Sequence, residues 1–174
     1  LTEVQPRAGE HTLRTEDIIA RITELGEELA LVCFGGVNFY TGQAFDMAAI
    51  TKAAHAVGAI AGFDLAHAAG NLHLKLHDWN VDFACWCSYK YLNSGPGSVA
   101  GAFVHQRHLG KDLPLFAGWW GHDKAERFKM ERTFKPMPTA EAWQVSNAPV
   151  FSMAVHRVAL ELFDRAGIAQ LRAK

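Results

Sequence analysis

Hydrophobic and polar positions along the first hundred residues follow two kinds of pattern. Apolar side chains recur three to four positions apart over 16–26 and 47–57, which is typical of amphipathic helices. Continuous apolar runs occupy 29–34 and 59–63, which is typical of strands buried on both faces of a parallel sheet. The order predicts a strand–helix–strand unit with parallel strands and a right-handed crossover.

Both predicted helices carry end signals. Thr15 stands where an N-cap is expected for the first helix, and Gly26 follows its last periodic residue. Asp46 is the corresponding cap of the second helix, and Gly58 is its stop.

Later segments predict a mixed sheet. Residues 72–80 read as a short helix or an irregular piece, and 81–87 as a strand. A glycine-rich turn leads to another strand at 99–104, and so short a connection favours an antiparallel pair. Residues 105–145 read as long loops, and 150–166 as a helix. The expected fold class is therefore α/β, with a central, mostly parallel sheet flanked by helices.

Composition excludes several classes of protein. The chain has 174 residues, of which 49% are hydrophobic and 20% charged, so one folded, soluble domain is expected. Its net charge of −1 provides no basic field for nucleic acid. No apolar run approaches the roughly 20 residues that cross a bilayer, and no signal peptide precedes the first helix, so we expect a cytoplasmic protein without a membrane partner.

Cysteines and histidines do not predict a metal site. Cys33, Cys85 and Cys87 fall in predicted buried strands, which favours small core residues in a reducing cytosol over a disulfide or a ligand pair. His73 and His77 have the i,i+4 spacing of two zinc ligands, but the metalloprotease glutamate and a third ligand are missing. We therefore expect no metal.

Lys90 and Asp64 are the candidate catalytic pair. Each follows a predicted strand, and the carboxyl ends of these strands share the sheet edge where open α/β proteins bind ligands. A lysine that forms a Schiff base and an aspartate that pairs with a protonated pyridine nitrogen are the groups that hold pyridoxal phosphate (PLP). The alternatives are a lysine that reaches to water and an aspartate that makes a turn or a cap.

Tyr89 and His67 stand beside this pair. Tyr89 has a hydroxyl that could bond the PLP phosphate or relay protons, although a half-buried aromatic is the simpler reading. His67 could brace Asp64 or lie near the ring, although a histidine in a loop is more often structural.

Seven stretches, in the same order and spacing, closely resemble the kynureninase family: VNFYTGQ at 37–43, GFDLAHAAGN at 62–71, LHDW at 76–79, VDFACWCSYKYLN at 81–93, GWWGH at 118–122, RFKM at 127–130 and SN at 146–147. The resemblance runs from about Pro6 to the end of the chain. It implies a PLP-dependent transferase fold of fold type I, like that of aspartate aminotransferase.

The resemblance also implies an activity and its residues. The family hydrolyses L-kynurenine or 3-hydroxy-L-kynurenine to L-alanine and anthranilate or 3-hydroxyanthranilate, in tryptophan catabolism and NAD biosynthesis. Lys90, Tyr89 and Asp64 would be catalytic. His67, Trp119 and Asn147 would join these three as cofactor contacts, with Trp119 and Asn147 reaching the site of the neighbouring subunit in a homodimer. An asparagine at the position of Asn147 further implies a preference for the 3-hydroxy substrate.

Two other readings stay open. A cysteine desulfurase-like enzyme would share the fold and the cofactor, but there a histidine typically precedes the lysine, where this chain has Tyr89. The chain could also be a non-catalytic module. The resemblance implies that residues 1–174 are the central part of the large PLP-binding domain. The family's N-terminal segment and C-terminal small domain would be absent, and the fragment alone would be inactive.

Overall fold

The computed structural model describes residues 1–173. The helices and strands in chain order are α1 (Thr15–Leu25), β1 (Leu31–Gly35), α2 (Met47–Ala56), β2 (Ile60–Asp64), β3 (Phe83–Trp86), β4 (Gly101–Val104), α3 (Val150–Ala166) and α4 (Ile168–Arg172). Short 3₁₀ turns lie at Gly26–Glu28, Gln106–His108, Arg127–Lys129 and Ala140–Trp143.

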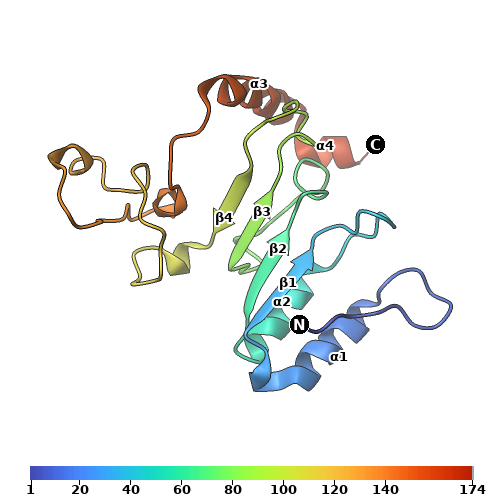
Figure 1. Ribbon diagram of the computed structural model, residues 1–174. Coiled ribbons are helices and arrows are strands. Elements are labelled where there is room, and N and C mark those ends of the chain that lie inside the picture. The colour runs from blue at the N-terminus through green and yellow to red at the C-terminus, as the bar shows by residue number, and fades with distance from the viewer. Residues whose placement is uncertain (174) are drawn as a thin grey trace.

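The four strands form one sheet in the order β1-β2-β3-β4 (Figure 1). The pairs β1–β2 and β2–β3 are parallel, and β3–β4 is antiparallel. The predicted mixed sheet and its strand–helix–strand unit are confirmed. Because the first three strands run in one direction, their carboxyl ends form one edge, as the ligand-site prediction requires.

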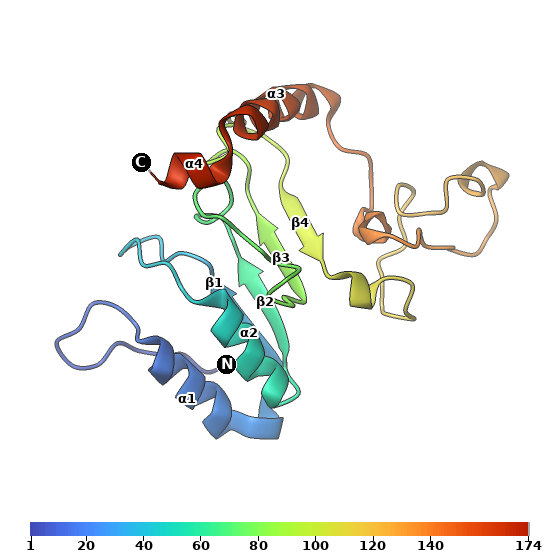
Figure 2. The same cartoon turned by 180° about the vertical axis from the view of Figure 1, so that it is seen from behind.

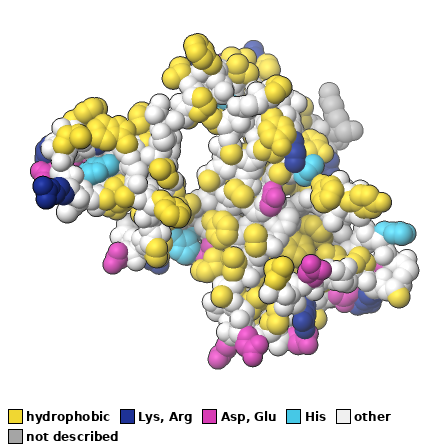
Figure 3. All heavy atoms as spheres, viewed as in Figure 1, with side chains coloured by type: hydrophobic (Ala, Val, Ile, Leu, Met, Phe, Trp, Pro, Cys, Tyr) yellow, Lys and Arg dark blue, Asp and Glu magenta, His cyan; other side chains and the backbone are white. Residues whose placement is uncertain are grey.

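One face of the sheet carries the core. Helices α1 and α2 cover it, and Figure 2 shows α2 lying across β1 and β2. Ile18, Ile50 and Phe63 are almost completely buried there. The opposite face is open, and Figure 3 shows apolar side chains on that side of the molecule.

The prediction of strands buried on both faces was wrong for β1. Its side chains alternate, with Leu31 and Cys33 exposed and Val32 buried. Cys85 of β3 is also exposed and Cys87 is half-buried, so the expectation of three core cysteines was wrong as well. The residues of β1 are apolar on both faces of the sheet, but the described helices cover only one of these faces.

Local end signals were correct in most places. Asp46 caps α2 by accepting a hydrogen bond from the main-chain N–H of Ala49 (2.9 Å). Gly26 and Gly58 follow their helices with positive φ angles of 54° and 82°. Thr15, however, is the first helical residue of α1, and Arg14 occupies the N-cap position without a side-chain cap.

Residues 105–145, predicted as long loops, contain three 3₁₀ turns and one isolated bridge between His122 and Pro136. Figure 1 shows the yellow-to-orange part of this region extending sideways from the sheet before the chain returns to α3. Within residues 1–173, no helix is both long and apolar enough to cross a membrane.

Candidate functional site

Asp64 is the last residue of β2 and lies between β1 and β3. Its neighbours in register are Gly35 and Cys85, and its side chain is exposed. One carboxylate oxygen, Oδ1, accepts a hydrogen bond from the main-chain N–H of Ala66 (2.8 Å). Asp64 thus makes a local turn and still presents a carboxylate to solvent. Its role in the turn is therefore compatible with pairing to a pyridine nitrogen.

The charge of Asp64 reaches its neighbour in β3. Partial burial and the Asp64 carboxylate both raise the pKa of the Cys85 thiol, with Cys33 adding a smaller effect in the same direction. A thiol with a raised pKa stays protonated at neutral pH, so Cys85 is a poor nucleophile here.

Lys90 lies in a closed loop after β3. The loop begins at buried Ser88, whose hydroxyl contacts that of Ser98 at 2.6 Å. It ends where the N–H of Ser94 donates to the carbonyl of Ser88 (3.1 Å). The Ser94 hydroxyl also contacts Nδ1 of His156 in α3 (2.7 Å). Lys90 therefore projects from a turn that is fixed at both ends, and its side chain is half-buried.

The structure brings His67 and Lys90 together. Nζ of Lys90 lies 3.0 Å from Nε2 of His67, and it lies 5.9 Å from the ring centre of Tyr89. Phe39 and Tyr91 have ring centroids 6.4 and 6.0 Å from that of His67. Asp64 ends β2, and His67, Tyr89 and Lys90 follow β2 or β3 at the same carboxyl edge, as the sequence predicts.

Trp119 and Asn147 do not contact Lys90 within the described chain. The Trp119 ring packs edge-on against Phe128 (5.2 Å between centroids), and the Asn147 side chain contacts Ser146. Arg127 is buried beneath this segment and donates to the carbonyls of Trp120 (3.0 Å) and His122 (2.8 Å). The roles of Trp119 and Asn147 stay predictions.

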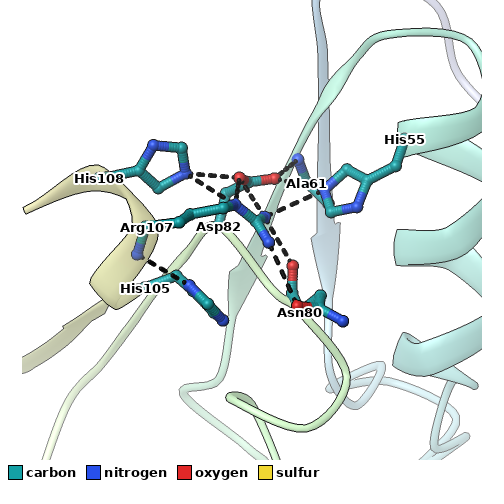
Figure 4. Close-up of polar contacts among 7 residues, drawn as sticks. All are labelled: His55, Ala61, Asn80, Asp82, His105, Arg107 and His108. Carbon is teal, nitrogen blue, oxygen red and sulfur yellow. Dashed lines mark hydrogen bonds and ion pairs between the residues drawn. The ribbon is translucent and has the colours of Figure 1, made fainter.

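A second polar cluster lies around Asp82, just before β3 (Figure 4). The buried carboxylate accepts hydrogen bonds from the N–H of Ala61 (2.8 Å) and from Arg107, and it contacts Nε2 of His55 (2.7 Å) and of His108 (2.6 Å). Burial raises the pKa of Asp82, but the hydrogen bonds outweigh burial and hold it well below its usual range. Sequence reasoning missed this cluster.

The Asp82 cluster lies away from the candidate site. It joins the end of α2, the start of β2 and the turn after β4, at the opposite edge of the sheet from Lys90. A carboxylate with this many donors is already satisfied, so the cluster is suited to bracing the fold. Within residues 1–173, no three His, Cys, Asp or Glu side chains are grouped as a metal ion would require.

Solved structures identify the class of fold. The cysteine desulfurase CsdA of Escherichia coli superimposes with a TM-score of 0.71 at 18% identity, covering 87% of this chain and 37% of that one. A C-DES mutant with glycine covalently linked to the PLP cofactor gives a TM-score of 0.70 at 23% identity, covering 89% of this chain and 40% of that one. The predicted fold type I, aspartate aminotransferase-like architecture is confirmed.

Sequence comparisons give the family. The aminotransferase class-V model matches residues 5–174, and the chain belongs to this family. Curated kynureninases are similar throughout: that of Myxococcus xanthus is 64% identical over 99% of the chain, and that of Nematostella vectensis is 55% identical over 100%. The resemblance to kynureninases is thus confirmed. The chain spans 41% and 38% of the lengths of these two relatives.

Proposed function

We propose that the full-length protein that contains this chain is a PLP-dependent kynureninase, which hydrolyses L-kynurenine or 3-hydroxy-L-kynurenine to L-alanine and the corresponding anthranilate. The observation that carries the proposal is the 64% identity to a curated kynureninase over 99% of the chain. Placement of Asp64, His67 and Lys90 on adjacent turns at one sheet edge supports it.

The exposed groups at this edge fit the cofactor. Lys90 has a half-buried side chain on a fixed turn, which suits covalent attachment of the PLP aldehyde. Asp64 offers an exposed carboxylate whose Oδ1 is already oriented by Ala66, which suits pairing with the pyridine nitrogen. When bound, PLP would supply the electron sink for carbanion chemistry at the substrate.

The chain's own side chains then have distinct tasks. Asp64 would keep the pyridine nitrogen protonated, and Lys90, once displaced by the substrate amine, would move protons at the substrate carbon. Tyr89 adjoins Lys90 and has an exposed side chain, so its hydroxyl could bind the phosphate or relay protons.

The test uses the full-length protein with PLP and either substrate. We expect anthranilate or 3-hydroxyanthranilate, detected by fluorescence, together with one equivalent of alanine. Lys90→Ala should abolish turnover, whereas Lys75→Ala, at an exposed lysine away from the site, should keep it. Appreciable turnover by Lys90→Ala, or no product from the unmodified protein, would reject the proposal.

A cysteine desulfurase-like activity is the second candidate. The CsdA fold match favours it, but the same fold serves several reactions, and Tyr89 stands where desulfurases typically carry a histidine. Sulfide release from cysteine, measured in parallel with anthranilate release, separates the two activities.

Assembly and substrate preference extend the proposal. We infer a cytoplasmic homodimer in which Trp119 and Asn147 complete the partner's site, because the segment that carries them extends away from its own sheet (Figure 1). The asparagine at 147 is expected to favour the 3-hydroxy substrate. Equal catalytic efficiencies for the two substrates would contradict this preference.

A further inference from the structure

His67 is held in place from several directions. Its main-chain carbonyl accepts a hydrogen bond from Nδ2 of Asn71 (2.9 Å). Its ring has Tyr91 edge-on, with an interplanar angle of 69°, and Phe39 tilted at 35°. These aromatic neighbours come from the loop after β3 and from the loop after β1. Side chains from both adjacent loops therefore flank the ring.

In this position Nε2 of His67 lies 3.0 Å from Nζ of Lys90. A protonated lysine amine has three donors and no acceptor, so in this contact the amine donates and Nε2 accepts. Nε2 can accept when the ring is neutral and its proton lies on Nδ1. The two nitrogens are thus placed as a proton donor and a proton acceptor. Their separation of 3.0 Å is short enough for proton transfer.

We propose that His67 orients the Lys90 amine and takes its proton when the cofactor is attached. The inference rests on the proposed function, in which Lys90 carries PLP. An ordinary lysine amine is protonated at neutral pH and has no lone pair for attack on an aldehyde. His67 thus makes Lys90 reactive during loading, a role separate from any later contact with the bound cofactor.

The step balances without a further reactant. One ammonium proton moves to Nε2, and the freed lone pair forms a bond to the aldehyde carbon of PLP. The aldehyde oxygen leaves as water with the two remaining amine protons, which leaves a carbon–nitrogen double bond. The imidazolium of His67 then releases its proton to solvent.

The experiment measures the rate of attachment. Full-length apoprotein is mixed with PLP in a buffer free of primary amines, the absorbance change is followed by stopped flow, and borohydride-fixed label on Lys90 is quantified by mass spectrometry. His67→Ala should load about 100-fold more slowly, in the range of general base catalysis. His73→Ala, at an exposed histidine, should load at the unmodified rate.

Chemical rescue distinguishes proton transfer from a structural role. Added imidazole should raise the loading rate of His67→Ala in proportion to its concentration and leave the unmodified protein unchanged. His67→Gln, which can accept a hydrogen bond but cannot carry the proton, should bind PLP and still load slowly. Tyr91→Phe keeps the ring beside His67 and should load normally, whereas Tyr91→Ala should be slower.

Two results would overturn this inference and leave the proposed function standing. The first is that both His67 variants load PLP at the rate of the unmodified protein. The second is that imidazole does not rescue a His67→Ala protein whose circular dichroism matches that of the unmodified protein. If His67→Ala does not fold, the His67→Gln rate decides, because an unmodified rate there excludes proton transfer to residue 67. Absence of label on Lys90 in the unmodified protein would overturn the proposed function, and this inference with it.

Discussion

Gly70 lies directly against the main chain of Leu92, where the turn after β2 meets the loop that carries Lys90. A Cβ atom at residue 70 would lie 2.9 Å from the main-chain nitrogen of Leu92, closer than real Cβ contacts come. Gly70 also has a φ of +78°, which disfavours other residues. This glycine therefore lets the two segments meet so that His67 and Lys90 can touch.

Gly70→Ala should separate these two segments. The variant combines left-handed strain with a backbone clash that no side-chain rotation relieves, so we expect a loss of about 1–3 kcal/mol in stability and a clear loss of PLP affinity. Unfolding midpoints and PLP titration measure the two effects.

Gly58→Ala is the matched control for Gly70→Ala. Gly58 has a φ of +82°, but nothing lies within 4 Å of its added Cβ. Gly58→Ala should therefore lose stability through backbone strain but keep its PLP affinity. Equal PLP affinities in the two variants would contradict a role of Gly70 in the site.

Asp82→Ala should destabilise the fold without touching the site. The side chain is 3% exposed, and its removal leaves the Ala61 N–H without its acceptor and the Arg107 guanidinium with the main-chain carbonyl of Asn80 (2.7 Å) in place of a carboxylate. Because the Arg107 side chain is 30% exposed, water compensates part of the loss, and we expect a cost of about 1–3 kcal/mol. Asp78→Ala, whose side chain is 71% exposed, should change stability by less than about 0.5 kcal/mol. Similar unfolding midpoints for the two variants would contradict the bracing role.

The Asp82 cluster also predicts acid sensitivity. The folded pKa of Asp82 lies below its usual range, so its stabilising effect is present above the ordinary aspartate pKa of about 3.9 and is lost as pH falls toward the folded value. The groups that face it are Arg107, His55 and His108. The difference in unfolding free energy between the unmodified protein and Asp82→Asn should shrink from pH 5 to pH 3. A constant difference over this range would contradict the assignment.

Local signals account for the parts of the fold that the sequence predicts. The period of apolar residues locates α2 and α3, and Asp46 caps α2 because the acceptor and its N–H donor lie three residues apart. The edge of the sheet that carries the candidate site was also predictable from local signals. A strand–helix–strand unit fixes the direction of β1 and β2, and Asp64 ends β2.

Long-range contacts account for what the sequence could not predict. The partners of Asp82 come from α2 and from the turn after β4, and no spacing along the chain links these segments. The exposure of Cys33 and Cys85 depends on which face the helices cover, which an apolar run does not encode. The contact of Phe39 with His67 likewise depends on how two loops pack.

Arg127 should fix the shape of the segment that presents Trp119. It is 7% exposed, bonds two main-chain carbonyls through Nη2, and lies with its guanidinium carbon 5.1 Å from the Trp120 ring centre. Lysine cannot reproduce the planar stacking and the fork of donors. Arg127→Lys should therefore increase the rate of amide hydrogen exchange over 118–130. Loss of one charged hydrogen bond, which contributes about 1.5–3 kcal/mol, corresponds to an increase of about 10-fold or more.

Arg132→Lys provides the comparison, because Arg132 is exposed in the same segment. Its exchange rates over 118–130 should match those of the unmodified protein, and exchange in β1–β3 should change in neither variant. If Trp119 completes the site of a partner subunit, Arg127→Lys should also raise the KM for kynurenine while covalent PLP loading at Lys90 stays normal. Unchanged exchange in Arg127→Lys would show that the segment keeps its shape without the guanidinium.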